Sequence, residues 1–254
     1  MASLRLSLVL VLLLATAVGP GRAQTVSGKP VPRVPDADGW FGLFNGRDLS
    51  GWMTFDPGVW SVGGSGELSG RGPRSYLFSP GTYRNFILQA DAKLNNKGDS
   101  GIILRAALET GAPKGYEVQL CNTGDDVQKT GSLYNFEKVA VTTVADGEWS
   151  RQTVAIIGNR IMIQVNGKLL VDYPDKESTY TEGHIAFQQS DQASQVNFRN
   201  VRIKPLPDDI AAALSGLQKA FPSLAEKKNP TRPVVHRAVR QPPGLSARAG
   251  RTGG

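Results

Sequence analysis

Hydrophobic and polar residues alternate along most of the chain between Trp40 and Leu206. In the segment 86–94 every second residue is apolar, and the residues between them include glutamine, aspartate and lysine. The segments 116–120 and 160–165 repeat this alternation. A period of two is typical of a β-strand with one face in the core and the other toward solvent.

Turn signals and phase changes divide this region into short strands. The pair Asn166-Gly167, between two apolar runs, predicts a two-residue hairpin. Val196 and Phe198 share one phase and the apolar residues at 201 and 203 share the other, which predicts a β-bulge near Arg199-Asn200. Because no helix-length pattern interrupts these strands, the sequence predicts one all-β domain over 40–207, an antiparallel β-sandwich or jelly roll.

The first 23 residues have the pattern of an export signal. A lone Arg5 precedes an apolar run over 6–18, and small residues follow as far as Ala23. The run of about 13 residues is shorter than the roughly 20 that span a bilayer. The alternative is an uncleaved anchor. We expect a cleaved signal over 1–23, a secreted or periplasmic protein without a membrane partner after cleavage, and an extended lead-in over 24–39.

The C-terminal segment 208–254 differs in composition from the rest. Asp208 and Asp209 precede apolar residues at 210, 214 and 217, which predicts a short helix. The remainder is rich in Pro, Gly and Arg, and no regular structure is assigned to it.

Charge is distributed unevenly along the 254 residues. The formal net charge of +7 comes from the first 23 residues and from the C-terminal segment, so residues 24–206 carry about no net charge. A neutral domain argues against nucleic acid as a partner. The single Cys121 excludes an intramolecular disulfide, and without a nearby His it is predicted to be inert.

The candidate site residues come from two predicted strands and the loops that follow them. Glu117 and Gln119 project from the face opposite Val118, and Arg105 ends the strand before them. A solvated strand face would also alternate, but glutamate and glutamine are uncommon in strands, which favours a functional face. Carboxylates, amides and arginines hold sugar hydroxyls, so we expect a carbohydrate ligand. Tyr134 is expected to end the next strand.

Two further expectations concern metals and aromatic residues. A divalent cation is left open through Asp125, Asp126 or Asp191, although no spacing specifies one. The side chains expected to lie in the core rather than under a sugar are Trp52, Trp60 and Trp149.

Eight segments together resemble one known family, the 3-keto-disaccharide hydrolase domain. They are FGLFNGRDLSGW (41–52), SGIILR (100–105), GYEVQL (115–120), KTGSLY (129–134), DGEW (146–149), VNGKLLVDY (165–173), GHIAFQQ (183–189) and VNFRNVRIKPLP (196–207). The resemblance implies a concanavalin-like or laminin-G-like jelly roll in an exported protein. It also implies hydrolysis, or 1,2-elimination and hydration, of 3-keto-glycosides.

The resemblance also implies roles for individual residues. Glu117 would be the acid or base and Arg105 would stabilise negative charge. The residues expected to bind the sugar are Gln119, Asn122, Tyr134, Gln188 and Asp191. Ser190 stands where relatives often carry histidine. The alternatives are a non-catalytic carbohydrate-binding module and an adhesin that works through its basic tail. The oligomeric state is not indicated by the sequence.

Overall fold

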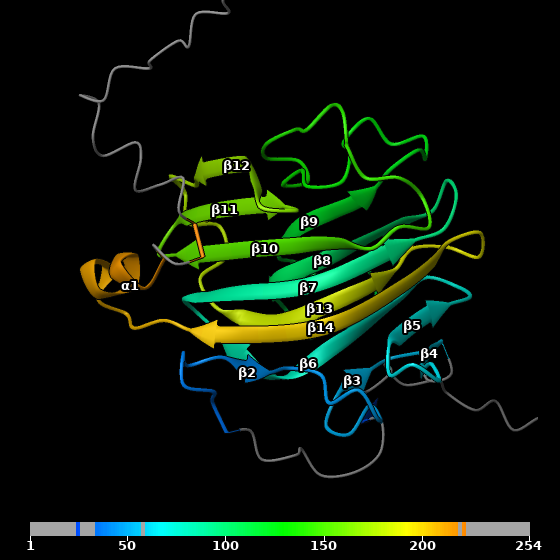
Figure 1. The fold of residues 1–254 in the computed structure, drawn as a ribbon, viewed down its shortest axis with the longest axis horizontal. Helices are drawn as coiled ribbons and strands as arrows, with labels where there is room; N and C mark the ends of the chain where they lie inside the picture. The colour runs from blue at the N-terminus through cyan, green and yellow to red at the C-terminus, as the bar shows by residue number, and fades with distance from the viewer. Residues whose placement is uncertain (1–23, 26–33, 57–58, 218–219, 222–254) are drawn as a thin grey trace, which may run out of the picture.

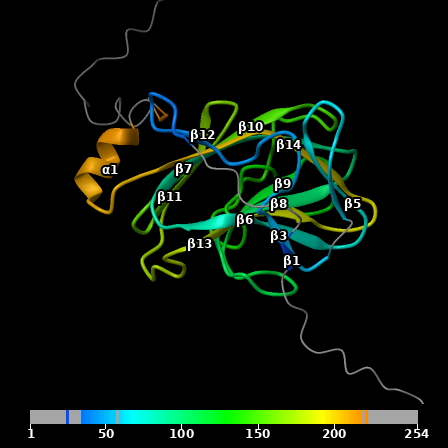
Figure 2. The same ribbon diagram turned by 90° about the horizontal axis from the view of Figure 1, so that it is seen from below.

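Two antiparallel sheets stack face to face in the computed structural model, which describes residues 24–25, 34–56, 59–217 and 220–221 (Figures 1 and 2). The expected signal and the far end of the tail lie outside these ranges. Within them, no helix is long and apolar enough to cross a membrane. The fold is the all-β sandwich that the alternation predicts.

The first sheet has six strands in the order β1-β3-β6-β13-β8-β9. Their bounds are β1 Gln24–Thr25, β3 Met53–Thr54, β6 Ser75–Tyr83, β13 Gly183–Gln189, β8 Asp99–Ala106 and β9 Tyr116–Cys121. This order places β13 between β6 and β8, so segments from the first, middle and last thirds of the domain become neighbours.

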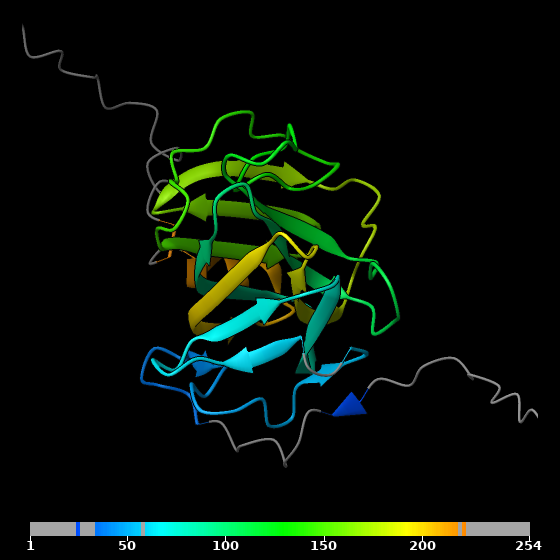
Figure 3. The same cartoon turned by 90° about the vertical axis from the view of Figure 1, so that its right-hand side faces the viewer.

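The second sheet has eight strands, seven of them in the order β12-β11-β10-β7-β14-β5-β4, with β2 pairing β14. Figure 3 shows β4 and β5 in cyan beside the yellow β14. The bounds are β2 Phe41–Gly42, β4 Trp60–Val62, β5 Leu68–Arg71, β7 Phe86–Leu94, β10 Ser150–Ile157, β11 Arg160–Val165, β12 Lys168–Pro174 and β14 Gln195–Pro205.

The alternating apolar residues meet between the sheets. From β7, Phe86 and Leu88 face Val118 of β9 and Phe187 of β13 within one buried cluster. Such burial contributes roughly 1.5–3 kcal/mol for each large side chain. The residues at the intervening positions therefore form the two outer faces of the sandwich, where polar side chains border smaller apolar clusters.

The predicted hairpin and bulge are both present. Val165 pairs with Lys168 across Asn166 and Gly167, whose φ angles are 50° and 82°. These positive values are those of a type I′ turn, which Asn-Gly adopts readily. In β14 the register with β7 shifts between Arg199 and Arg202, and Asn200 has a φ of 52°.

Two local expectations are corrected by the structure. Trp149 is only partly buried and lies on the outer face, although Trp52 and Trp60 are in the core. The segment that ends at Tyr134 is no strand: Leu133 makes isolated bridges, and Gly131 has a φ of 94°. A left-handed residue there breaks the extended backbone.

The predicted helix is α1, Ile210–Leu217, capped by Asp209, whose Oδ1 accepts a hydrogen bond from the Ala212 amide at 2.8 Å. Its buried residues are Ala213 and Leu217. Ile210 and Leu214 remain 47% and 37% exposed, so the stripe expected at 210, 214 and 217 is wrong in part. Ala213 takes the buried position because α1 packs on the outer face of the eight-stranded sheet.

Candidate functional site

Glu117 projects from β9 onto the outer face of the six-stranded sheet and leans over Gly101 of β8. A Cβ atom on Gly101 would lie 2.9 Å from both Cγ and Cδ of Glu117, and closer still to a carboxylate oxygen. Real Cβ atoms do not approach so closely. The glycine of the SGIILR segment therefore leaves the space that this carboxylate occupies.

A small apolar patch borders Glu117 on the same face. Its buried members are Tyr76, Phe78, Ile103, Ala106 and Ala186, with Met53 and Phe55 packed against them. Ile103 lies directly opposite Glu117 in the β8–β9 register.

Burial, together with the nearby Asp99 and Asp126 carboxylates, raises the pKa of Glu117 to about 7 against the opposing charge of Arg74. No hydrogen bond or ion pair to the Glu117 carboxyl is found among the described residues. A carboxyl with such a pKa can take up and release a proton near neutral pH.

Asp99, at the start of β8, connects three segments beside Glu117. Its Oδ1 accepts a hydrogen bond from Gln119 Nε2 at 2.9 Å, and its Oδ2 accepts one from Ser190 Oγ at 3.2 Å. Burial raises the pKa of Asp99, while the Ser190 hydrogen bond opposes that shift. Gln119 and Ser190 are thus both tied to a carboxyl of the site.

Tyr76 and Gln188 form a polar pair at the other side of Glu117. The two residues are opposite each other in the β6–β13 register, and Gln188 Nε2 donates to the Tyr76 hydroxyl at 3.0 Å. Burial raises the pKa of Tyr76, and the Glu117 charge adds to that effect. The phenol therefore stays protonated at neutral pH, with its own O–H left to donate.

The loop after β9 brings Tyr134 to the site. The Tyr134 amide donates to the Glu117 carbonyl at 2.8 Å, so this segment runs along the free edge of β9. The Asp126 carboxylate raises the pKa of Tyr134 and shares a hydrogen bond with it. Tyr134 and Asp126 thus form one wall beside Glu117.

Two residues predicted from the sequence, Arg105 and Asn122, do not join the group around Glu117. The Arg105 guanidinium donates to the carbonyls of Arg84 at 2.9 Å and Tyr180 at 2.6 Å. Arg105 has a φ of 52°, which breaks the alternation that would have placed it beside Glu117. The cation beside Glu117 is Arg74.

Asn122 is buried and serves the loop itself. Its Oδ1 accepts from Thr130 Oγ1 at 2.6 Å, and its Nδ2 donates to the Ala145 carbonyl at 3.3 Å. A sugar hydroxyl would have to displace these bonds. The structure therefore gives Asn122 a place in the loop rather than in the group around Glu117.

Asp191 and the aspartates considered for a metal lie at the rim. Asp191 Oδ1 accepts from the amides of Ala193 and Ser194, and Asp126 Oδ1 accepts from the Gln128 amide, so each carboxylate caps its own turn. Across the described ranges, no three His, Cys, Asp or Glu side chains are arranged to hold a metal ion.

Sequence reasoning missed Tyr76, Asp99 and Arg74. In the segment 75–79 Tyr76 and Phe78 have the phase opposite to the core residue Leu77, which is the signal that would have placed Tyr76 outward. No local pattern shows that β6 lies two strands from β8, so their shared face required the tertiary structure.

Most of the chain matches a known protein family. Residues 39–204 match the family described as the 3-keto-alpha-glucoside-1,2-lyase-like domain. No curated protein matches the chain.

Solved structures also resemble the fold. One from Parabacteroides distasonis, provisionally named a glycosyl hydrolase, is 27% identical with a TM-score of 0.60, over 67% of this chain and 95% of that one. A second of the same provisional name and organism is 24% identical with a TM-score of 0.56, over 66% and 99%. A Bacillus licheniformis β-glucanase shares the fold at 14% identity and a TM-score of 0.50, over 70% and 100%.

Proposed function

The chain belongs to the 3-keto-alpha-glucoside-1,2-lyase-like domain family, and we propose that it is an enzyme that cleaves 3-keto-glycosides with Glu117 as its acid–base group. The observation that carries the proposal is the Glu117 carboxyl. Its pKa lies near 7 and no protein group bonds it in the described structure. A carboxyl with this pKa and without a protein partner can exchange a proton with a bound substrate near neutral pH.

The reaction follows from the acidity of a carbon beside a ketone. The ionised Glu117 carboxylate takes the proton from C2, and the electron pair of the C–H bond forms an enolate with the C3 carbonyl. The enolate then expels the glycosidic oxygen from C1, and that oxygen receives the proton held by Glu117. The products are an alcohol and an unsaturated 3-keto sugar, and later addition of water completes net hydrolysis.

Tyr76 is the group proposed to stabilise the enolate. Gln188 Nε2 donates to its oxygen at 3.0 Å, which fixes the position of the hydroxyl and leaves its proton to point elsewhere. A neutral phenol that donates to a developing negative charge lowers the barrier most when it is held in place and partly desolvated. In this proposal it replaces the role that the sequence suggested for Arg105.

The surrounding residues suit a sugar ring. The partly buried Met53 and Phe55, which pack against the buried Tyr76 and Phe78, supply an apolar surface for C–H groups. Gln119, Gln188 and Tyr134 are proposed to bind hydroxyls at the edges, with Asp191 at the rim. Asn122 is left out of this set because both the oxygen and the nitrogen of its amide are bonded within the loop. Gln119 and Gln188 instead donate from Nε2 to Asp99 and Tyr76 of the site itself.

The test is turnover of a defined substrate. The protein would be incubated with a methyl 3-keto-glucoside in D2O, and the anomeric and C2 proton signals followed by NMR, with and without EDTA. We expect the anomeric signal to be lost, free methanol to form, and EDTA to change nothing. Glu117→Gln should abolish the loss of the anomeric signal and the release of methanol. Glu177→Gln, the same change at an exposed residue, should leave the rate unaltered.

Other outcomes would assign the site differently. Full turnover by Glu117→Gln would remove Glu117 from the mechanism. Broadening of the sugar signals by the wild-type protein without turnover would favour the non-catalytic carbohydrate-binding module, with Ser190, at a position where relatives often carry histidine, as the first residue to change.

Export is a second part of the proposal. Residues 1–23 have the composition of a cleaved signal, and they lie outside the described residues. N-terminal sequencing of the protein recovered from the periplasm or medium tests this, and a mature start near Gln24 is the expected result.

A further inference from the structure

The outer face of the eight-stranded sheet is divided into a covered half and an open half. At one end, Leu217 of α1 and Phe221 pack on Ile87, Ile157 and other apolar residues of the sheet. Figure 2 shows α1 confined to that end. Further along β7 the outward residues become Gln89, Asp91 and Lys93. Gln89 and Lys93 are partly exposed, and Asp91 is buried beneath the side chains that bond it. This open half lies on the side of the sandwich away from Glu117.

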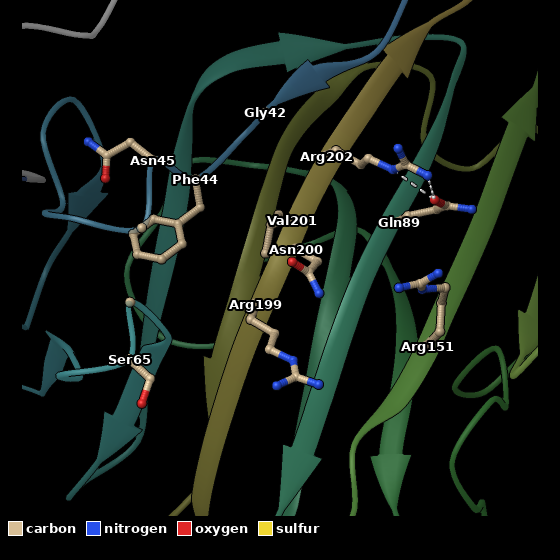
Figure 4. Close-up of a pocket in the computed structure, with 12 residues that line it drawn as sticks. Gly42, Phe44, Asn45, Ser65, Gln89, Arg151, Arg199, Asn200, Val201 and Arg202 are labelled. Atoms are coloured by element: carbon tan, nitrogen blue, oxygen red, sulfur yellow. Dashed lines mark hydrogen bonds between the residues drawn. The ribbon is translucent and has the colours of Figure 1, made fainter. Parts of the chain in front are cut away.

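Two adjoining hollows occupy the open half, with volumes of about 600 and 590 Å³. Both are lined by Gln89, Arg151 and Arg199, and the first also by Arg202 (Figure 4). Amide and hydroxyl groups complete the walls, among them Asn45, Ser65, Asn200, Thr153 and Asn166. Asp91 is the one acidic side chain among the lining residues of these two hollows.

The bulge in β14 is what brings two of the arginines together. Arg199 and Arg202 are three residues apart, and in a regular strand they would point to opposite faces. The register shift between them and the positive φ of Asn200 turn both onto the outer face. The third, Arg151, comes from β10, which pairs with β7.

Each guanidinium is held in place by a neighbour. The Arg199 guanidinium lies 4.1 Å from the Trp149 ring centre, and that of Arg202 lies 4.6 Å from the Trp40 ring centre. Arg151 makes two hydrogen bonds to Asp91, at 2.8 and 3.4 Å. Arg202 also donates from Nε and Nη2 to Gln89 Oε1, at 2.9 and 2.6 Å (Figure 4). Stacking on an aromatic ring uses the plane of the guanidinium, so the outer Nη edges of Arg199 and Arg202 keep N–H groups available.

Positive charge is in excess on this face of the sheet. Asp91 is shared by Arg151 and, at 3.7 Å, by Arg199, so one carboxylate serves two arginines. Lys93 adds a further charge 4.8 Å from the centre of Trp149. Residues 24–206 as a whole are neutral, so the excess marks this face rather than the domain.

From this geometry we propose that the open half of the sheet binds a polyuronate, a polysaccharide that bears a carboxylate on each sugar. Fixed arginine edges match carboxylates in a two-point geometry. The amides and hydroxyls between them match sugar hydroxyls. This second site lies apart from the Glu117 site and does not depend on turnover there.

The test is calorimetric titration of the full chain with tetragalacturonate, and with its methyl ester as the uncharged counterpart. We expect tetragalacturonate to bind and its methyl ester to bind at least tenfold more weakly. Higher salt should lower the affinity for tetragalacturonate. The double variant Arg199→Gln, Arg202→Gln should lose at least tenfold in affinity. Arg199→Lys, which keeps the charge but loses the planar guanidinium that can bind a carboxylate at two points, should lose severalfold in affinity.

The control addresses the basic C-terminal segment, which would also attract an anion. Arg237→Gln with Arg240→Gln removes the same charge there and should change affinity less than twofold. Glu117→Gln should bind as the wild type does. Near-UV circular dichroism checks the fold of each variant. Lys93→Gln should also lower the affinity for tetragalacturonate, without the removal of an arginine.

Three results would overturn the proposal. One is the absence of tetragalacturonate binding by the wild type. Another is an equal loss from the tail variant, which would move the contact to the tail. The last is equal affinity for a short DNA duplex, which would mean that the face responds to negative charge of any kind.

Discussion

Gly101 and Glu117 lie on the neighbouring strands β8 and β9, and the Glu117 carboxylate fills the space that a side chain at position 101 would occupy. This arrangement turns the Glu117 carboxyl toward Gln188 and Tyr76 across β8. It also buries the carboxyl beside Ile103, which raises its pKa. The position of the proposed acid–base group is thus set by the absence of a Cβ on the adjacent strand.

The first prediction concerns that space. In Gly101→Ala, the new methyl group would force the Glu117 carboxyl to move, and a displacement of about 1 Å can cost on the order of 100-fold in rate. We expect kcat on a 3-keto-glucoside to fall about 10- to 100-fold with the fold retained. Gly64→Ala is the matched control, because a Cβ there would meet no atom within 4 Å. Equal rates for the two variants would contradict the arrangement.

The second prediction concerns the pH dependence of turnover. Since the base must be ionised, kcat/KM should rise with pH through an apparent pKa of about 7. The Asp99 charge helps to raise that pKa, so Asp99→Asn should move the acid limb to lower pH. A pH–rate profile of both proteins measures the shift. A limb that stays in place would mean that another group titrates.

The third prediction concerns stability. The folded protein holds the pKa of Glu117 at about 7, above its ordinary 4.5, so the protonated form is favoured by folding. This contribution is complete below pH 4.5 and is lost as pH rises through 7. Glu117→Gln should match the wild type at pH 4 and exceed it at pH 8, by on the order of 2–3 kcal/mol. Urea unfolding at both pH values measures this, and a constant difference would contradict it.

The fourth prediction separates binding from chemistry at Tyr76. Tyr76→Phe keeps the ring in the apolar patch and removes the hydroxyl, so we expect KM to change little and kcat to fall on the order of 100-fold. The Gln188 amide loses its partner, which costs about 1–3 kcal/mol of stability. Steady-state kinetics at a temperature well below unfolding give the answer. A change in KM alone would make Tyr76 a binding residue only.

The fifth prediction tests the Arg105 role suggested by sequence. Arg105→Ala removes the donors to the Arg84 and Tyr180 carbonyls, and we expect a loss of about 2–3 kcal/mol in the free energy of unfolding. The folded fraction should retain its kcat. Loss of activity in a variant that is fully folded would restore Arg105 to the mechanism.

The sequence by itself determined the strand pattern, one hairpin and one bulge, because each is a local property of the chain. Alternation of period two reports which residues share a face, Asn166-Gly167 reports a turn, and the phase change near Arg199 reports the extra residue. It also placed the Glu117 and Gln119 side chains on the outer face of their strand, and its motifs indicated the family. These conclusions need no knowledge of which strands are neighbours.

Only the tertiary structure decided what surrounds Glu117. The order β6-β13-β8-β9 joins Tyr76, Asp99 and Gln188 to it, and strand order depends on long-range pairing that alternation does not encode. A positive φ turns Arg105 away, and the same kind of backbone deviation at Asn200 gathers Arg199 and Arg202 on the opposite face. Both effects arise where the chain departs from a regular strand, because there the period of two no longer predicts the direction of a side chain.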